Sequence, residues 1–472
     1  MAQEVKTLVK APAKTYGRVD AVPRESRRMG NWDLFATWIG ANANNGTWYI
    51  GGVIAACGFL TASTTLMVVG VLAYVLLAAA SYMGYRTGLP AMALTRASFG
   101  LRGSVVPSII NVVQFIGWAA VNTFIAATSI SYIFGELFGW PLYGKPGGNF
   151  GLIVGIIIMS VLHLLSISMG ERSVRLIERV GIILVVVFVL WESVVVFQTV
   201  SFHDIVSWQP PHALKMSSGV AADTLAAFNL AWVTAASDFS RFTNKRSAAT
   251  TASFLGANIG LFWFALIGLF ATIGTAVSLN HFDPNNSDPS TVAAKLGLGV
   301  IALLVIVLTS TTANAVNLMS AGSALTNITH RLSLNVSLWV VTILATAVSF
   351  IPVYLASFLD VFETFLDGIG MFLGPEIAIF LLDYFVLKRR RYQLKEFTAV
   401  HGTYWYAHGV NWVAVASWTL GVAAYWGLKQ VSVIADTVGA TFIAMALTAL
   451  IYWIGMLVTT STSSVDGEEQ VD

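Results

Sequence analysis

Residues 40–48 read GANANNGTW, and this short polar stretch decides the fold. It interrupts an otherwise apolar segment, because LFATWI precedes it at 34–39 and YIGGVIAACGFL follows it at 49–60. Lipid offers no partner to a free backbone N–H or C=O, so irregular backbone at membrane depth needs cover from protein or a cavity. The stretch therefore predicts a transmembrane helix that is broken at its middle.

The whole chain has the composition of a membrane protein. Of its 472 residues, 56% are hydrophobic and 11% are charged, whereas about a quarter of the residues in soluble domains are charged. A helix needs about 20 apolar residues to cross the hydrocarbon layer, and roughly twelve such stretches follow one another along the chain. We therefore predict an all-α integral membrane protein with about twelve transmembrane helices and little chain left for a soluble domain.

A second helix shares the anomaly of the first. The sixth apolar span, AAFNLAWVTAASDFSRF at 226–242, is poor in bulky aliphatic residues and rich in small and polar ones. Two interrupted helices in corresponding places of two halves are the sequence sign of a secondary transporter built from inverted repeats. In such a protein the breaks free carbonyl groups for a cation and expose half-helix ends to a substrate.

Lysine and arginine indicate the topology. With twelve spans and a basic amino terminus, the even-numbered connections should be cytoplasmic and carry the positive charge. They contain Arg86, Arg96, Arg102, Arg172, Arg175, Arg179, Arg241, Lys245, Arg246, Arg331, Lys388, Arg389, Arg390, Arg391 and Lys395. The other side keeps Lys145, Lys215, Lys295 and Lys429. We expect a multi-pass protein of the cell membrane with both termini in the cytoplasm.

The third span carries a face suited to a flat ligand. In NVVQFIGWAAVNTF, at 111–124, a spacing of four places Gln114, Trp118 and Asn122 on one side of the helix. The indole can stack on an aromatic ligand, and the two amides can form hydrogen bonds with its edge. The alternative is that the amides bridge helices and that the tryptophan fills a gap.

The sixth span offers further candidates in Phe228, Asn229 and Trp232. One of its aromatic rings, placed opposite Trp118, would sandwich a ligand. The residues alone leave open which ring it is, and lipid contact or packing is an equal alternative for each.

The eighth span contains LTSTTANAVNLMSAGS at 308–323. The hydroxyl groups of Thr311 and Thr312 are neutral oxygen ligands, which suit Na⁺ together with carbonyls of an unwound helix. The alternative is that each hydroxyl bonds to a carbonyl one turn back. Asn314 and Asn317 point to different faces, so we expect one of them to meet the substrate.

Charge and cysteine usage exclude several kinds of site. The third and eighth spans hold no charged residue, and an unpaired charge at this depth is costly, so the site suits a neutral ligand. The carboxylates Glu192, Asp367 and Glu376 are candidates for proton carriers or for paired groups. The single cysteine, Cys57, excludes an intrachain disulfide and a multi-cysteine metal site.

Three further motifs together resemble one family. They are GYRTGLPAMALTRASFGLRGSVVPSII at 84–110, SDFSRFTNKRS at 237–247 and LLDYFVLKRRRYQ at 381–393. They are similar to segments of the nucleobase:cation symporter family, particularly its bacterial cytosine permeases and its allantoin and hydantoin permeases. The similarity extends from about residue 29 to about residue 400.

The resemblance implies a leucine-transporter-type fold, with two inverted repeats of five helices, broken helices 1 and 6, and two extra helices. The segments would be an amino-terminal tail (1–30), a transport core (31–390), helices 11 and 12 (391–460) and a carboxy-terminal tail (461–472). The family's cation site, carried over without gaps, places carbonyls at Ile39 and Asn42 and hydroxyls at Thr311 and Thr312. Its helix 6 aromatic falls on Asn229, which passes the stacking role to Phe228 or Trp232.

Taken together, these features predict cation-coupled uptake of a neutral nucleobase of the cytosine or purine type, or of a related heterocycle. Na⁺ is the expected coupling ion and H⁺ its alternative, with no other cofactor. An amino-acid:cation symporter of the same fold is the competing hypothesis, because half-helix dipoles and Na⁺ can also hold a carboxylate. No enzyme motif such as HExxH is present, and we expect the lipid bilayer and a small substrate as partners, not nucleic acid. The oligomeric state is left open.

Overall fold

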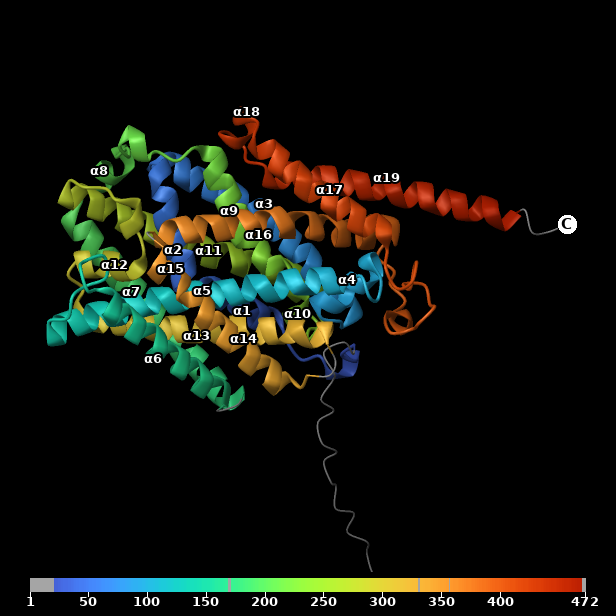
Figure 1. The fold of residues 1–472 in the computed structure, drawn as a ribbon, viewed down its shortest axis with the longest axis horizontal. Helices are drawn as coiled ribbons and strands as arrows, with labels where there is room; N and C mark the ends of the chain where they lie inside the picture. Colours follow the sequence, from blue (N-terminus) through green and yellow to red (C-terminus); the bar gives the residue numbers. More distant parts are fainter. Residues whose placement is uncertain (1–20, 169–170, 330–331, 356, 469–472) are drawn as a thin grey trace, which may run out of the picture.

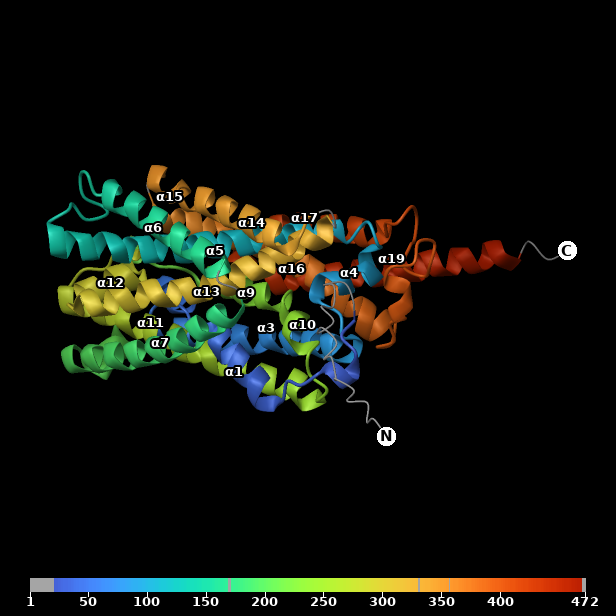
Figure 2. The same ribbon diagram turned by 90° about the horizontal axis from the view of Figure 1, so that it is seen from below.

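A computed structural model describes residues 21–168, 171–329, 332–355 and 357–468. Helices form nearly all of it, and most of the long ones run along the longest dimension of the molecule (Figure 1, Figure 2). Some predicted features lie outside the described residues, namely positions 1–20 and 469–472 of the two tails and the basic residue Arg331.

The long helices follow the predicted order of spans. The first five spans are α1 (Asn31–Asn42) with α2 (Asn45–Ile54), α3 (Phe59–Thr87), α5 (Val105–Phe138), α6 (Asn149–Ser168) and α7 (Glu171–Thr199). The next five are α9 (Ser218–Val233) with α10 (Ala236–Ser240), α11 (Ser253–Leu279), α13 (Gly299–Ile328), α14 (Leu334–Ser349) and α16 (Phe358–Leu382). The last two are α17 (Trp412–Lys429) and α19 (Thr441–Glu468).

Short helices occupy the connections. They are α4 (Ala91–Phe99), α8 (Phe202–Ser207), α12 (Pro289–Lys295), α15 (Ile351–Tyr354) and α18 (Ser432–Ala435). Among the described residues, 9 helical segments are long and apolar enough to cross a membrane. The broken pair α1–α2, together with α7 and α17, brings the number of spans to the predicted twelve. The predicted fold class is confirmed.

The two ends of the bundle differ in charge. One end holds α4 and α10, and the basic connection at 388–411 lies beside them; the other end holds α8, α12 and α15 (Figure 1, Figure 2). We call them the basic end and the opposite end.

The first helix breaks where the polar stretch predicts. α1 ends at Asn42 and α2 starts at Asn45. Asn44 caps α2, because its Oδ1 accepts from the backbone N–H of Thr47 at 3.0 Å while its Nδ2 donates to the carbonyl of Ala41 at 2.6 Å. The amide nitrogen of Asn45 lies 2.9 Å from the carbonyl of Ile306 in α13. The asparagines thus supply partners that lipid lacks.

The second break separates α9 from α10 at residues 234–235. The hydroxyl of Thr234 donates within hydrogen-bond distance to Asn111 Oδ1 (2.8 Å) and to the carbonyl of Ala231 (2.9 Å). Gln114 donates to Thr234 Oγ1 at 2.7 Å. Polar side chains of α5 therefore stabilise the unwound turn.

Glycine permits close packing of α2 on α11. A Cβ atom at Gly51 would lie 1.9 Å from the carbonyl oxygen of Ala265, and one at Gly268 would lie 1.9 Å from that of Trp48. Small residues at such crossings let transmembrane backbones approach each other. Any larger residue would push the second half of the broken helix away from α11.

The two extra helices, α17 and α19, form a layer against α16 (Figure 1). α19 continues as a helix to Glu468 and extends past the other helices at the basic end (Figure 1). The segment expected as a carboxy-terminal tail therefore begins with helical residues, 461–468.

Candidate functional site

A cavity of about 710 Å³ lies between α1, α5, α9, α10 and α13, and Ala43 and Asn44 of the first break line it. Met29, Trp32 and Asp33 at the start of α1 line it, as does Phe239 of α10, so it extends toward the basic end. Six predicted residues also line it: Trp118, Asn122, Phe228, Trp232, Thr312 and Asn317. The cavity is therefore lined by predicted residues from three separate helices, α5, α9 and α13.

Two aromatic rings form a corner of the cavity. The ring centroids of Trp118 and Phe228 lie 5.2 Å apart, and their planes meet at 87°. A flat ligand can stack on one ring and meet the other at its edge. Trp232 also lines the cavity but packs against Trp38 at 6.2 Å and Phe115 at 6.4 Å. Of the three candidates of the sixth span, Phe228 is the ring that meets Trp118.

Amide groups lie next to this corner. Asn122 Nδ2 donates to the carbonyl of Trp118 at 3.0 Å, whereas its buried Oδ1 has no donor among the described residues. Asn44 Oδ1, Phe228 and Asn122 Oδ1 all surround Gly46. A Cβ atom placed on this glycine would lie 3.0 Å, 3.9 Å and 4.0 Å from them, respectively. Asn44 was not among the predicted site residues. Its place in the polar stretch was the available signal.

Two predicted substrate residues, Gln114 and Asn314, face other helices instead of the cavity. Gln114 bonds to the second break, as described above. Asn314 Nδ2 lies 2.9 Å from the carbonyl of Ala119, 3.0 Å from Thr123 Oγ1 and 3.2 Å from His163 Nε2. Asn317, one turn along α13, reaches Asn314 Oδ1 at 3.4 Å and lines the cavity. Gln114 and Asn314 therefore bridge helices, which was the alternative weighed for Gln114. Of the two asparagines of the eighth span, Asn317 is the one that lines the cavity.

Asn229 lies behind the cavity in a bond to Tyr74 of α3. The Tyr74 hydroxyl is 2.7 Å from Asn42 Oδ1 and 3.1 Å from Asn229 Oδ1, and Asn229 Nδ2 has no partner among the described residues. A hydroxyl has one proton, so Tyr74 can donate to only one of the two amide oxygens. If the Asn229 amide is turned so that its nitrogen faces Tyr74, Asn229 Nδ2 donates to the hydroxyl oxygen, and the hydroxyl donates to Asn42 Oδ1. Tyr74 thereby joins the ends of both broken helices, a role that no sequence pattern indicated.

The four predicted cation ligands differ in their relation to the cavity. The carbonyl of Ile39 accepts from Ala43 N at 2.8 Å and lies 3.0 Å from the position of a Cβ at Gly260 in α11, so it faces that helix. The carbonyl of Asn42 accepts from Asn44 N at 3.0 Å. Only Thr312 of the four lines the cavity.

The threonine hydroxyls donate to carbonyls of their own helix, Thr311 to Val307 at 2.9 Å and Thr312 to Thr309 at 2.8 Å. Such a hydroxyl keeps lone pairs that can bind a cation. The lining of the cavity includes Gly40 of α1 and Ala43 in the first break, each one residue beyond the predicted carbonyls. One residue rotates the helix face by about 100°, so these two positions present a different face from Ile39 and Asn42.

The three candidate carboxylates, of which Glu192 and Glu376 are buried, lie outside the cavity lining. Glu192 Oε2 accepts from Trp48 Nε1 at 2.7 Å, and neither carboxylate oxygen of Glu376 has a partner among the described residues. Asp367 bonds to Lys429 at 3.1 Å. Within the described part of the chain, no group of three His, Cys, Asp or Glu side chains is placed to hold a metal ion.

Comparison with known proteins identifies a family that matches this chain. The profile of permeases for cytosine/purines, uracil, thiamine and allantoin matches residues 21–455. A Bacillus subtilis protein that carries the name purine-cytosine permease is 26% identical over 422 residues, covering 86% of each chain. The allantoin permease of the same organism is 23% identical over 428 residues, covering 85% of each. The uracil permease of Saccharomyces cerevisiae is 24% identical over 467 residues, covering 91% of this chain and 72% of its own.

Solved structures show the same fold. The inward-facing conformation of Mhp1 has a TM-score of 0.76 at 19% identity and covers 94% of this chain and 93% of its own. Mhp1 in a closed conformation with bromovinylhydantoin bound, described as a nucleobase-cation-symport-1 family transporter, also has a TM-score of 0.76, at 18% identity, and covers 94% and 96%.

Proposed function

Because the chain belongs to the family of permeases for cytosine/purines, uracil, thiamine and allantoin, we propose that it imports a neutral nucleobase or a related heterocycle by cation symport. The chain is a membrane transporter and not an enzyme. The observation that carries the substrate class is the corner of Trp118 and Phe228 beside Asn122.

The chemistry of this corner favours a flat ring that donates a hydrogen bond. Stacking on an aromatic side chain tolerates any planar ring. The buried Oδ1 of Asn122 has no donor among the described residues, and the N–H of a lactam or ring amide would supply one, which offsets the cost of an unpaired buried acceptor. The one charged residue in the lining, Asp33, caps the start of α1 through a 2.7 Å bond with Gly30 N, which supports a neutral substrate.

For the cation we propose Na⁺, bound between α1 and α13. Gly40 and Ala43 line the cavity and have the three-residue spacing expected for the carbonyl ligands of such a site, and Thr312 of the facing helix, which also lines it, would supply a hydroxyl. Carbonyls at an unwound helix end and neutral hydroxyls are hard oxygen ligands for Na⁺. This replaces Ile39 and Asn42, whose carbonyls are engaged elsewhere.

The positive charge of the basic end supports an orientation. Cytoplasmic loops carry the lysine and arginine excess, so we place the basic end and both termini in the cytoplasm of a cell whose plasma membrane holds the protein. The cavity, which extends toward that end, then faces the cytoplasm.

Thermal unfolding of the purified protein tests the proposal. Uracil, cytosine, hypoxanthine, allantoin, hydantoin and phenylalanine are added separately, each with Na⁺ and with choline, because a ligand that binds the folded state raises Tm. We expect one heterocycle to raise Tm more in Na⁺ than in choline. A rise with phenylalanine alone would contradict the substrate class, and a rise that is equal in both salts would contradict Na⁺ coupling.

A further inference from the structure

α16 packs against Trp118, one of the residues that line the cavity. Phe362 and Phe365 lie on Trp118, with ring centroids 6.0 Å and 5.3 Å away. A Cβ atom at Gly117 would lie 2.1 Å from Phe365, so this ring fits against the backbone of α5. For a transporter with alternating access, the rings must leave Trp118 before ligand can enter from the opposite end.

The two parts of α16 are held differently. Pro375 lies inside the helix and has no N–H to donate, which weakens the helix at this point. Close to it, a Cβ atom at Gly421 of α17 would lie 2.9 Å from Pro375 and 2.1 Å from Thr448 Oγ1 of α19, so this region is tightly packed. The part before Pro375, which carries both phenylalanines, packs through apolar side chains such as Phe358, stacked on Phe124 at 4.2 Å, and has a polar anchor in addition.

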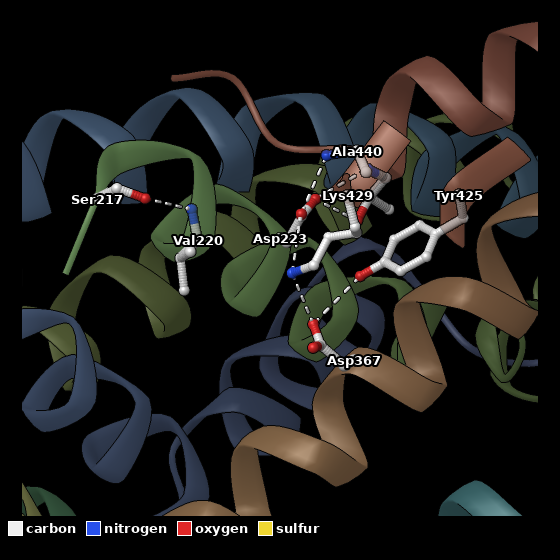
Figure 3. A network of polar contacts seen from close by, with 8 residues as sticks. Ser217, Val220, Asp223, Asp367, Tyr425, Lys429 and Ala440 are labelled. Atoms are coloured by element: carbon white, nitrogen blue, oxygen red, sulfur yellow. Dashed lines mark hydrogen bonds and ion pairs between the residues drawn. The ribbon is translucent and has the colours of Figure 1, made fainter. Parts of the chain in front are cut away.

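That anchor is an ion-pair network at Asp367 (Figure 3). The Nζ atom of Lys429, the last residue of α17, lies 3.1 Å from Asp367 Oδ1 and 3.7 Å from Asp223 Oδ2 of α9. The hydroxyl of Tyr425, one turn earlier in α17, donates to Asp367 Oδ1 at 3.3 Å. Lys429 thus joins three helices.

Asp223 is the fixed partner in this network. It is 3% exposed and accepts from the backbone N–H groups of Ala440 at 3.0 Å and Thr441 at 2.8 Å. It also accepts from the Thr441 hydroxyl at 2.7 Å. These bonds tie α9 to the start of α19, and they hold Asp223 without Lys429. Asp367, by contrast, is 56% exposed, and among the described residues its side chain forms hydrogen bonds and an ion pair with Tyr425 and Lys429 of α17. It is therefore the partner that can leave.

We propose that Lys429 is a positioning residue for transport. From the extra helix α17 it anchors the part of α16 before Pro375 to α9, and thereby keeps Phe362 and Phe365 on Trp118 while the cavity is open at the basic end. The two extra helices, α17 and α19, thus help to keep α16 packed on Trp118. The inference needs alternating access, but neither a particular substrate nor a coupling ion.

Cysteine labelling tests this role. Ala227 of α9 is 1% exposed and faces α16, since its Cβ lies 3.5 Å from the position of a Cβ at Gly370. In a Cys57→Ser background, which removes the single native cysteine, Ala227→Cys reports when α16 leaves α9. A membrane-impermeant maleimide is added to sealed vesicles of either orientation, and the labelling rate from the opposite end is measured.

We expect Lys429→Met and Asp367→Asn each to raise this rate by roughly two- to fivefold, the range of a partly exposed ion pair. Lys429→Arg, which keeps the charge, should retain slow labelling. Glu363→Gln removes an acid of the same helix that has no ion pair to Lys429 within 4.0 Å, and is the matched control. Labelling that is unchanged in both Lys429→Met and Asp367→Asn would overturn the proposal, and so would an equal rise in Glu363→Gln. Asp367→Asn keeps the test valid if Lys429→Met unfolds.

Discussion

Tyr74→Phe should loosen both broken helices through the loss of one hydroxyl group. Tyr74 is fully buried, and its hydroxyl lies 2.7 Å from Asn42 and 3.1 Å from Asn229. The ring remains in Tyr74→Phe, so no cavity forms; the change leaves two buried amides without this partner. Each unpaired buried group costs about 1–3 kcal/mol in soluble proteins, whereas interhelical hydrogen bonds in membranes average about 0.6 kcal/mol.

We expect a net loss of about 1–2 kcal/mol in the free energy of unfolding, because both amides are inside the bundle and the described residues offer Asn229 Nδ2 no other partner. Substrate affinity should fall by up to about tenfold, which corresponds to 1.4 kcal/mol, since Asn229 directly follows Phe228 and Asn42 directly precedes the cavity residue Ala43. Unfolding and ligand titration of the purified variant measure both quantities.

Tyr49→Phe is the matched control for this experiment. Tyr49 is as fully buried as Tyr74, but its hydroxyl has no partner among the described residues. Its removal should therefore be neutral or slightly stabilising. Equal losses of stability in Tyr74→Phe and Tyr49→Phe would refute the reasoning. An effect of Tyr74→Phe on affinity that persists in a Phe228→Ala background would show that Tyr74 does not act by positioning that ring.

Three further changes test the site and the packing. Phe228→Ala should weaken binding of a flat ligand by roughly 10- to 100-fold, as loss of base stacking does, with Trp232→Ala clearly milder in the same titration; the reverse order would reassign the stacking ring. Thr312→Ala should raise the Na⁺ concentration for half-maximal uptake several-fold, and an unchanged Na⁺ dependence would remove this hydroxyl from the cation site. Gly268→Ala should lower Tm strongly, because its Cβ would lie 1.9 Å from a backbone oxygen of α2, at a cost of about 1–3 kcal/mol or more. Gly368→Ala is its control, because a Cβ atom at Gly368 would meet no neighbouring atom within 4 Å. Equal stability of the two variants would contradict the packing argument.

Hydropathy and the polar stretch at 40–48 were sufficient to predict the class of fold. A lipid environment forbids unpaired backbone groups, so both the spans and their two interruptions leave a mark in the local sequence. Trp118 and Asn122 could be predicted for the same local reason, because a spacing of four residues places them on one face of a helix, and both line the cavity.

Only the tertiary structure decided which face of each helix meets the cavity. Periodicity relates residues within one helix, but it does not set the rotation of that helix against its neighbours, and one residue turns the face by about 100°. For this reason Gln114 shares a face with Trp118 and yet bonds to the second break, and Ile39 faces α11 while Gly40 lines the cavity. The contacts of Tyr74 and Lys429 join helices that are distant in sequence, and no local pattern encodes such a meeting.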